Sequence, residues 1–257
     1  MANSSHAMDL SLLIPAYNER ARILQTVDSV RSFLATRSWT FEILVIDDGS
    51  LDDTAAVVEQ GAGSRPGLRC VRARANAGKG AAIRLGLAAA LGDVTGFIDA
   101  DDKTDIAALD EVFAQLQAGA DIVIGDRTLA GSDIAVPRRA YRQWGSDQFR
   151  RLLRWWMGLG DFPDTQCGFK FSRTTVMREL FQCMQTDGYM FDVELLLLAT
   201  RKGQSVARIP VRWRDDPDSR FKPVSGSLRN LRELSRIREF HRPRLDGAIP
   251  ADDGHGS

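Results

Sequence analysis

The sequence predicts an α/β fold in which a mostly parallel central sheet is flanked by helices, as in Rossmann-like proteins. Short apolar runs alternate along the first half of the chain with segments whose apolar residues recur every three or four positions. The runs stop at proline, glycine or closely spaced aspartates, which are typical of strand ends in such sheets. No linker or change of composition divides the 257 residues, so we expect a single domain over residues 9–245.

The first strand–helix–strand unit lies between residues 10 and 46. Residues 10–15 and 41–46 are apolar runs that predict buried strands. Helical spacing joins the apolar residues between them, which are Ile23, Val27, Val30 and Leu34. This order implies parallel strands with a right-handed crossover.

The alternation continues to residue 124. Strands are predicted over residues 68–71, 94–98 and 122–124. One helix is predicted from a stripe of Ile83, Leu87 and Leu91, and a second from a stripe of Ile106, Leu109, Phe113 and Leu116. A doubly wound sheet of this kind has a nucleotide-sized crevice at the carboxyl ends of its strands.

The second half has a different rhythm. We expect a short strand over residues 169–171, a helix over 190–200, an extended segment over 206–213 and a last amphipathic helix over 227–240. The segment 138–157 is rich in Arg, Trp and Leu.

Composition and charge exclude several classes of protein. With 44% hydrophobic and 26% charged residues the chain is ordinary for a soluble globular protein. Lys+Arg and Asp+Glu both number 34, so no global charge attracts nucleic acid, and we expect no nucleic-acid partner. The three cysteines follow no metal or redox spacing, and the histidines lie in polar tails or after a charged helix. A histidine zinc site is therefore not expected.

No window reaches the roughly 18 apolar residues of a membrane span. Residues 1–8 also lack the apolar stretch of a signal peptide, so we expect a cytoplasmic protein. Residues 1–8 and 246–257 are polar and contain glycine or serine, and both tails are expected to be disordered.

The most informative motif is an Asp-x-Asp formed by Asp99 and Asp101, directly after the strand 94–98. Two carboxylates at a strand's carboxyl end can hold a divalent cation against a nucleotide diphosphate. The alternative is that acidic residues here cap a helix.

Three further motifs end strands or precede a helix in the same way: residues 15–19 (Pro-Ala-Tyr-Asn-Glu), 47–50 (Asp-Asp-Gly-Ser) and 76–80 (Asn-Ala-Gly-Lys-Gly). Tyr17 can stack on a base, Asp47 can accept hydrogen bonds from a pyrimidine or ribose, and Lys79 can bring a cation to the ligand. Each motif alone is also explained as turn or cap chemistry. Because all three motifs occur in order before the Asp-x-Asp motif, we favour a nucleotide-sugar site.

Together these motifs resemble those of the inverting family 2 glycosyltransferases of GT-A fold. Residues 125–127 (Gly-Asp-Arg), 164–170 (Asp-Thr-Gln-Cys-Gly-Phe-Lys) and 191–196 (Phe-Asp-Val-Glu-Leu-Leu) resemble the branch that contains dolichyl-phosphate glucosyltransferases and mannosyltransferases. The second of these stretches is most similar to the glucosyl members. The resemblance extends from about residue 10 to about residue 238.

The resemblance implies roles for particular residues. The nucleotide pocket would be lined by Pro15, Ala16, Tyr17, Glu19, Asp47 and Lys79. Asp99 and Asp101 would serve the sugar diphosphate and a Mg²⁺ or Mn²⁺ ion, with Asp101 as the direct metal ligand. Mannosyl members often place a glutamine ligand where this chain has Lys103, and a protonated lysine cannot coordinate a metal. Ligation would then rest on Asp101, phosphate oxygens and water, with Asp102 as a further candidate.

The resemblance also implies an acceptor. A polyprenyl phosphate is already ionised and needs cationic contacts, for which the candidates are Arg127, Lys170, Arg220 and Lys222. A sugar or glycan hydroxyl would instead need a carboxylate base, either Asp192 or Asp164. The alternative for Arg127 and Lys170 is a solvated surface charge, and for Asp192 and Glu194 it is helix capping.

We expect UDP-glucose as donor and a polyprenyl phosphate as acceptor. The first alternative is transfer to a soluble or glycan hydroxyl, and the second is a non-catalytic nucleotide-sugar-binding module.

Residues 138–159 favour contact with a membrane surface. Aromatic and leucine side chains fall near one side of a predicted helix whose other side carries four arginines. This pattern is typical of an interfacial helix at the inner face of a membrane, with help from residues 227–240. The alternative is that the tryptophans pack on the sheet.

Overall fold

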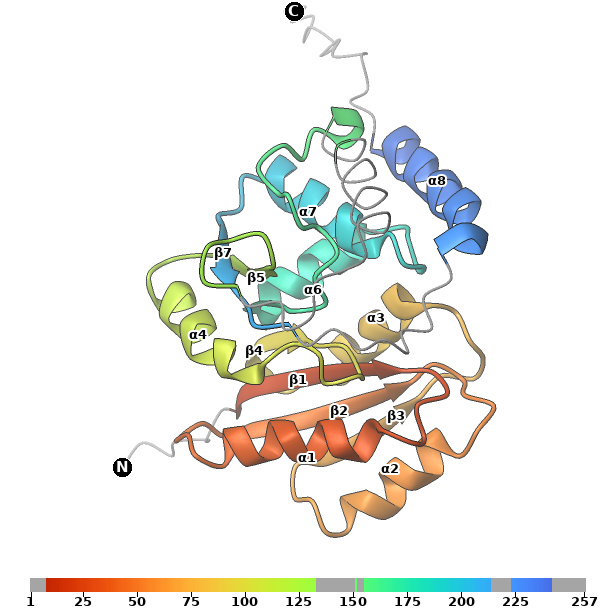
Figure 1. Ribbon diagram of the computed structural model, residues 1–257, viewed down its shortest axis with the longest axis vertical. Helices are drawn as coiled ribbons and strands as arrows, with labels where there is room; N and C mark the ends of the chain where they lie inside the picture. Colours follow the sequence, from red (N-terminus) through yellow and green to blue (C-terminus); the bar gives the residue numbers. More distant parts are fainter. Residues whose placement is uncertain (1–7, 133–150, 152–154, 214–222, 242–257) are drawn as a thin grey trace, which may run out of the picture.

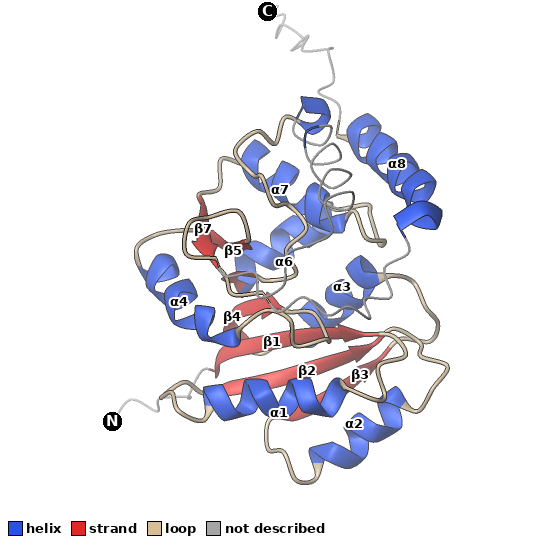
Figure 2. Cartoon of the chain, in the orientation of Figure 1, coloured by secondary structure: helices blue, strands red, loops and turns tan. Residues whose placement is uncertain are grey.

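The computed structural model describes residues 8–132, 151, 155–213 and 223–241. It has a central sheet with helices on both faces, which confirms the predicted α/β class (Figure 2). Seven strands form the sheet in the order β3-β2-β1-β4-β6-β5-β7.

The first half of the chain has the expected alternation (Figure 1). Its elements are β1 (Met8–Ala16), α1 (Ile23–Leu34), β2 (Phe41–Asp47), α2 (Thr54–Ala62), β3 (Leu68–Arg72), α3 (Lys79–Ala89) and β4 (Gly92–Phe97). The second half follows with η1 (Ile106–Ala108), α4 (Leu109–Gln117), β5 (Ile122–Asp126), β6 (Lys170–Arg173), α6 (Thr174–Cys183), α7 (Phe191–Arg201), β7 (Val206–Pro210) and α8 (Pro223–Phe240).

All strand pairs are parallel except those of β6, which runs antiparallel to both β4 and β5. In the register of the parallel strands, Ala16 lies beside Asp47 at the carboxyl ends of β1 and β2. Leu13 of β1 lies beside Phe97, the last residue of β4. The motifs that follow these strands therefore meet at one edge of the sheet.

The core lies on both faces of the sheet because strand side chains alternate between them. Leu12 and Ile14 pack with α1 and α4 on one face. Leu13 packs with α3, α6 and α7 on the other face, as do Leu234 and Ile237 of α8. The four apolar residues predicted to define α1 are fully buried.

Several details differ from the sequence-based expectation. The helices α2 and α6 were not predicted. Leu91 was placed on the stripe of α3, but the helix ends at Ala89 and Leu91 is 66% exposed. The turn out of α3 comes early because Ala90 adopts an extended backbone and leads directly into β4. The strand β6 begins at Lys170 rather than at residue 169, and β4 begins at Gly92 and ends before Ile98.

The predicted tails lie outside the described residues, except that Met8 already belongs to β1. Most of the predicted helix over 138–157 also lies outside them. Within the described part of the chain, no helix combines the length and the apolar character needed to cross a bilayer.

Candidate active site

The loops after β1 and β2 form one side of the site. Tyr17 follows β1 directly and is 40% exposed, so its ring is accessible to a ligand. Asn18 adopts φ 56° and its side-chain oxygen accepts a hydrogen bond from the backbone of Leu51 at 2.8 Å. Glu19 donates its backbone N–H to Thr54 at 2.9 Å and binds Arg22 through its carboxylate. These contacts hold the two loops together.

Two aspartates at the end of β2 have different tasks. Asp47 is 2% exposed and accepts a long hydrogen bond of 3.2 Å from the backbone of Ser50. Asp48 accepts hydrogen bonds from the backbone N–H groups of Ala77 and Gly78, at 3.0 and 2.9 Å. It thereby fixes the turn that leads into α3. The sequence analysis gave Asp48 no role, although it stands within a motif that was singled out.

Gly78 makes that turn possible. Its φ is +111°, and a Cβ at this position would lie 2.5 Å from the carbonyl oxygen of Asp187. Only glycine tolerates both conditions without strain. Lys79, the first residue of α3, is consequently aimed at the carboxyl end of β4.

Lys79 and Asp99 form an ion pair in the middle of the site. The distance from Lys79 Nζ to Asp99 Oδ1 is 2.5 Å, and the two side chains are 17% and 28% exposed. Burial opposes the charged form of Lys79, but the carboxylates of Asp99 and Asp192 outweigh it and raise the pKa of the lysine. The site therefore contains a permanent cation beside the first carboxylate of the Asp-x-Asp motif.

Asp101 has the properties expected of a metal ligand. Its Oδ2 lies 3.1 Å from Lys103 Nζ, and its Oδ1 is buried with no hydrogen-bond partner. A buried carboxylate oxygen without a partner is costly unless something binds it. No group of three His, Cys, Asp or Glu side chains suited to a metal occurs among the described residues. The residues present thus fit a cation that takes one protein carboxylate and further oxygen ligands from elsewhere.

Arg127 is held rigidly by Asp164. Its Nε and Nη2 donate to the two carboxylate oxygens at 2.7 Å each, and its backbone N–H donates to Oδ2 at 3.0 Å. Its guanidinium also lies 4.6 Å from the ring centre of Trp213. Burial raises the pKa of Asp164, but the guanidinium more than offsets this, and the net pKa lies below its ordinary value. No hydrogen bond of its Nη1 group is found among the described residues.

Lys170 and Asp192 form a buried ion pair. Lys170 is 0% exposed, and its Nζ lies 2.6 Å from both Asp192 Oδ1 and the carbonyl oxygen of Cys167. Asp192 is 4% exposed, and burial raises its pKa despite the neighbouring lysines. The alternative of a solvated surface charge for Lys170 is wrong, because β6 places its side chain inside the core. The acceptor contact by Lys170 and the base role of Asp192 stay predictions.

The structure gathers the other predicted residues as follows. Pro15 and Ala16 end β1, where Ala16 lies beside Asp47. Glu194 lies inside α7; its carboxylate accepts hydrogen bonds from two backbone N–H groups and lies 2.6 Å from His241 Nε2. Gly168 was not singled out individually: a Cβ there would lie 2.2 Å from Asp99 Oδ2, so its lack of a side chain makes room for the carboxylate. Arg220 and Lys222 lie outside the described residues.

Comparison with known proteins identifies the family of the chain. The family model described as "Glycosyl transferase family 2" matches residues 11–176. The chain belongs to this family. It is accordingly a glycosyltransferase, and the matched segment contains Tyr17, Asp47, Lys79, Asp99 and Asp101.

Several curated relatives of this glycosyltransferase share a name. The dolichyl-phosphate beta-glucosyltransferase of Drosophila melanogaster is 33% identical over 247 residues, which cover 91% of this chain and 75% of the relative. The proteins of the same name from Dictyostelium discoideum and Homo sapiens are each 31% identical. The matches cover 89% and 91% of this chain and 73% and 76% of those relatives.

Solved structures show the same fold. The crystal structure of glucosyl-3-phosphoglycerate synthase from Mycobacterium tuberculosis matches 90% of the glycosyltransferase and 80% of its own chain, with a TM-score of 0.66 and 22% identity. Its complex with Mn²⁺, UDP and glucosyl-3-phosphoglycerate matches with a TM-score of 0.63 and 24% identity. The architecture is therefore the GT-A fold expected from the sequence.

Proposed function

We propose that this glycosyltransferase transfers glucose from UDP-glucose to a polyprenyl phosphate, with inversion at the anomeric carbon. The observation that carries the proposal is that relatives about 30% identical over some nine tenths of the chain are named dolichyl-phosphate beta-glucosyltransferases. The geometry of the site supports it, because the described cations and carboxylates suit a diphosphate donor and an anionic acceptor.

In the proposed donor complex, Tyr17 stacks on the uracil and the buried Asp47 accepts a hydrogen bond from the base or ribose. Lys79 lies where the diphosphate would approach Asp99, and the partnerless oxygen of Asp101 would hold a Mg²⁺ or Mn²⁺ ion. The bound cation would stabilise the negative charge that develops on the departing diphosphate. Lys79 contributes to the same stabilisation without needing to gain or lose a proton.

The acceptor side needs no general base if the nucleophile is a phosphate. Asp192 would be a poor base for a hydroxyl acceptor, because it is buried and ion-paired with Lys170. Asp164 is likewise engaged by Arg127. Arg127 is the proposed acceptor contact: Asp164 and Trp213 orient its guanidinium, and the Nη1 group can donate to a phosphate oxygen.

A transfer assay tests the proposal directly. Radiolabelled UDP-glucose is incubated with a polyprenyl phosphate or with 3-phosphoglycerate, with Mn²⁺ or with excess chelator, and the products are partitioned between organic solvent and water. We expect label in the lipid fraction only with the cation. Label that appears only with 3-phosphoglycerate, or full transfer in chelator, would contradict the proposal.

A matched pair of variants tests the metal ligand. Asp101→Ala should abolish transfer while the thermal unfolding curve stays close to wild type, because it removes the proposed ligand. Asp93→Ala changes an exposed aspartate near the opposite end of β4 and should retain activity. Equal activity of the two variants would remove Asp101 from the site.

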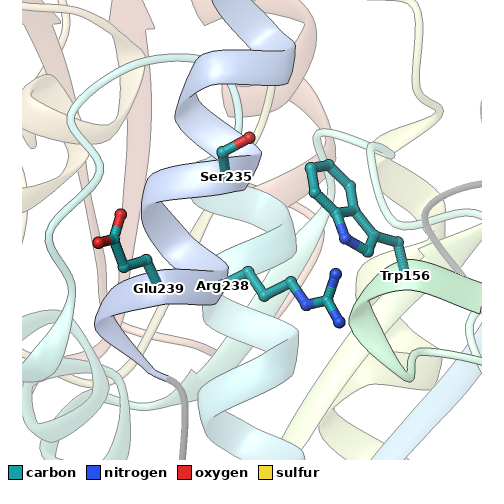
Figure 3. A pocket seen from close by; sticks show the side chains of 4 residues that line it. All are labelled: Trp156, Ser235, Arg238 and Glu239. Carbon is teal, nitrogen blue, oxygen red and sulfur yellow. The ribbon is translucent and has the colours of Figure 1, made fainter.

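We further propose peripheral contact with the inner face of a membrane. Trp155 is 83% exposed, whereas Trp156 packs against α8, with the guanidinium of Arg238 5.6 Å from its ring centre. A cavity of about 360 Å³ is lined by Trp156 and Arg238 together with Ser235 and Glu239 (Figure 3). Trp155 is therefore the residue available for insertion among lipid headgroups, whereas the ring of Trp156 is engaged by α8.

Co-sedimentation with anionic liposomes tests this contact. The wild type should pellet at low salt and be released at high salt, because arginine attraction to anionic lipid is screened. Trp155→Ala should pellet less, whereas Leu91→Ala should behave as wild type, since Leu91 is an exposed apolar residue outside the proposed contact, directly before β4. A wild type that stays in the supernatant at low salt would contradict the proposal.

A further inference from the structure

Lys103 is a largely buried cation placed against the carboxylate proposed to hold the metal. Its side chain is 10% exposed, and its Nζ lies 3.1 Å from Asp101 Oδ2. Burial keeps the ammonium of this lysine within the loop, next to the Asp-x-Asp motif. The contact is therefore a built feature of the loop after β4.

The two aspartates of the Asp-x-Asp motif are consequently each paired with a lysine of their own. Asp99 binds Lys79 at 2.5 Å, and Asp101 binds Lys103 at 3.1 Å. Only Asp101 keeps a second oxygen that is buried and has no hydrogen-bond partner. The ammonium of Lys103 thus contacts one carboxylate oxygen of Asp101, and the other oxygen has no hydrogen-bond partner among the described residues.

We propose that Lys103 is a tethered cation that competes with the divalent metal for Asp101 until a nucleoside diphosphate is bound. This inference rests on the proposed function, because it assigns the metal to Asp101. A protonated lysine cannot coordinate a metal, and its charge repels a dication only a few ångströms away. The free enzyme therefore holds Mn²⁺ or Mg²⁺ weakly.

A diphosphate changes this balance. Its negative charges attract both the ammonium and the metal, so Lys103 can turn from Asp101 toward a phosphate oxygen while the metal binds the carboxylate. Nucleotide and metal then bind cooperatively, and each raises the affinity for the other by the same factor. The metal would be retained only when a donor is present.

The experiment measures Mn²⁺ binding rather than activity. Free Mn²⁺ is quantified by electron paramagnetic resonance in titrations of the wild type, Lys103→Met and Lys103→Arg, each with and without UDP. Lys202→Met is the matched control, because Lys202 pairs with the exposed Glu179 at 2.5 Å far from the motif in sequence. Circular dichroism melting curves confirm that each variant is folded.

Without UDP, Lys103→Met should bind Mn²⁺ roughly tenfold more tightly than the wild type, since one repelling charge has been removed. Lys103→Arg and Lys202→Met should match the wild type. The factor by which UDP tightens Mn²⁺ binding should shrink in Lys103→Met to the same extent.

The outcomes separate two failures. Equal Mn²⁺ affinities of the wild type and Lys103→Met without UDP, including no detectable binding by either, overturn the role of Lys103. If the wild type and Lys103→Met still bind Mn²⁺ when UDP is present, the proposed function stands without a role for Lys103. A wild type that binds no Mn²⁺ even with saturating UDP overturns both the role of Lys103 and the metal dependence of the proposed function.

Discussion

Breaking the interior pair of Lys170 and Asp192 should cost more stability than any exposed ion pair of the protein. Lys170 is fully buried and Asp192 nearly so, with 2.6 Å between Nζ and Oδ1. Replacing one partner leaves the other as an uncompensated charge in the core. Asp192→Leu or Lys170→Met should each lower the free energy of unfolding by about 3 to 5 kcal/mol.

The double variant gives the opposite expectation. With both charges replaced by apolar side chains of similar size, no buried ion is left without a partner, so Lys170→Met/Asp192→Leu should lie within about 1 kcal/mol of the wild type. The exposed pair of Lys202 and Glu179 is the control, and breaking it should change stability by less than about 1 kcal/mol.

Urea unfolding followed by circular dichroism measures these differences, provided that the slope against urea is the same in every variant. The reasoning is refuted if either single variant stays within 1 kcal/mol of the wild type. It is also refuted if the double variant is as unstable as the sum of the two single ones.

Three further predictions concern the surroundings of this pair. Gly168→Ala should weaken UDP-glucose binding roughly tenfold in calorimetry, because its Cβ would displace the Asp99 carboxylate from a charge-assisted contact; an unchanged dissociation constant would contradict this. Arg127 lowers the pKa of Asp164 in the folded protein. The stability that Asp164 contributes is therefore complete above about pH 4, and it is lost as the pH falls through the pKa that Asp164 has in the folded protein. The difference in free energy of unfolding between the wild type and Asp164→Asn, measured in urea, should therefore become smaller at acid pH. A difference that does not change with pH would contradict the lowered pKa of Asp164. Burial raises the pKa of Cys167 to about 12, so iodoacetamide at pH 8 should leave it unmodified in the folded protein, as checked by peptide mass spectrometry.

The parts of the fold that repeat a clear pattern were predictable from the sequence. The apolar residues of α1 recur at helical spacing, and β1 and β2 are short apolar runs that stop at proline or at paired aspartates. The helix α2 gave no such stripe, because its short span buries only Ala55 and Val58 among its apolar residues and includes Gly61. The direction of β6 was also hidden, since a run of four residues looks the same in a parallel or antiparallel pair.

The position of the candidate site was predictable from polar residues that follow a strand or begin a helix. Asp99 and Asp101 follow β4, Lys79 begins α3, and the structure pairs Lys79 with Asp99. What the sequence could not show is which charges neutralise one another. Lys170 and Asp192 are 22 positions apart, so their pairing depends on the packing of β6 against α7.

The reversed direction of β6 has a consequence for how the chain between β5 and β6 is anchored. The chain leaves β5 and enters β6 at the same rim of the sheet, where Gly125 donates its backbone N–H to the carbonyl of Phe169 at 2.8 Å. Arg127 and Asp164, which lie shortly after β5 and shortly before β6, form an ion pair at 2.7 Å. The backbone hydrogen bond and the ion pair would therefore tie β5 to β6 whatever the length of chain between Arg127 and Asp164.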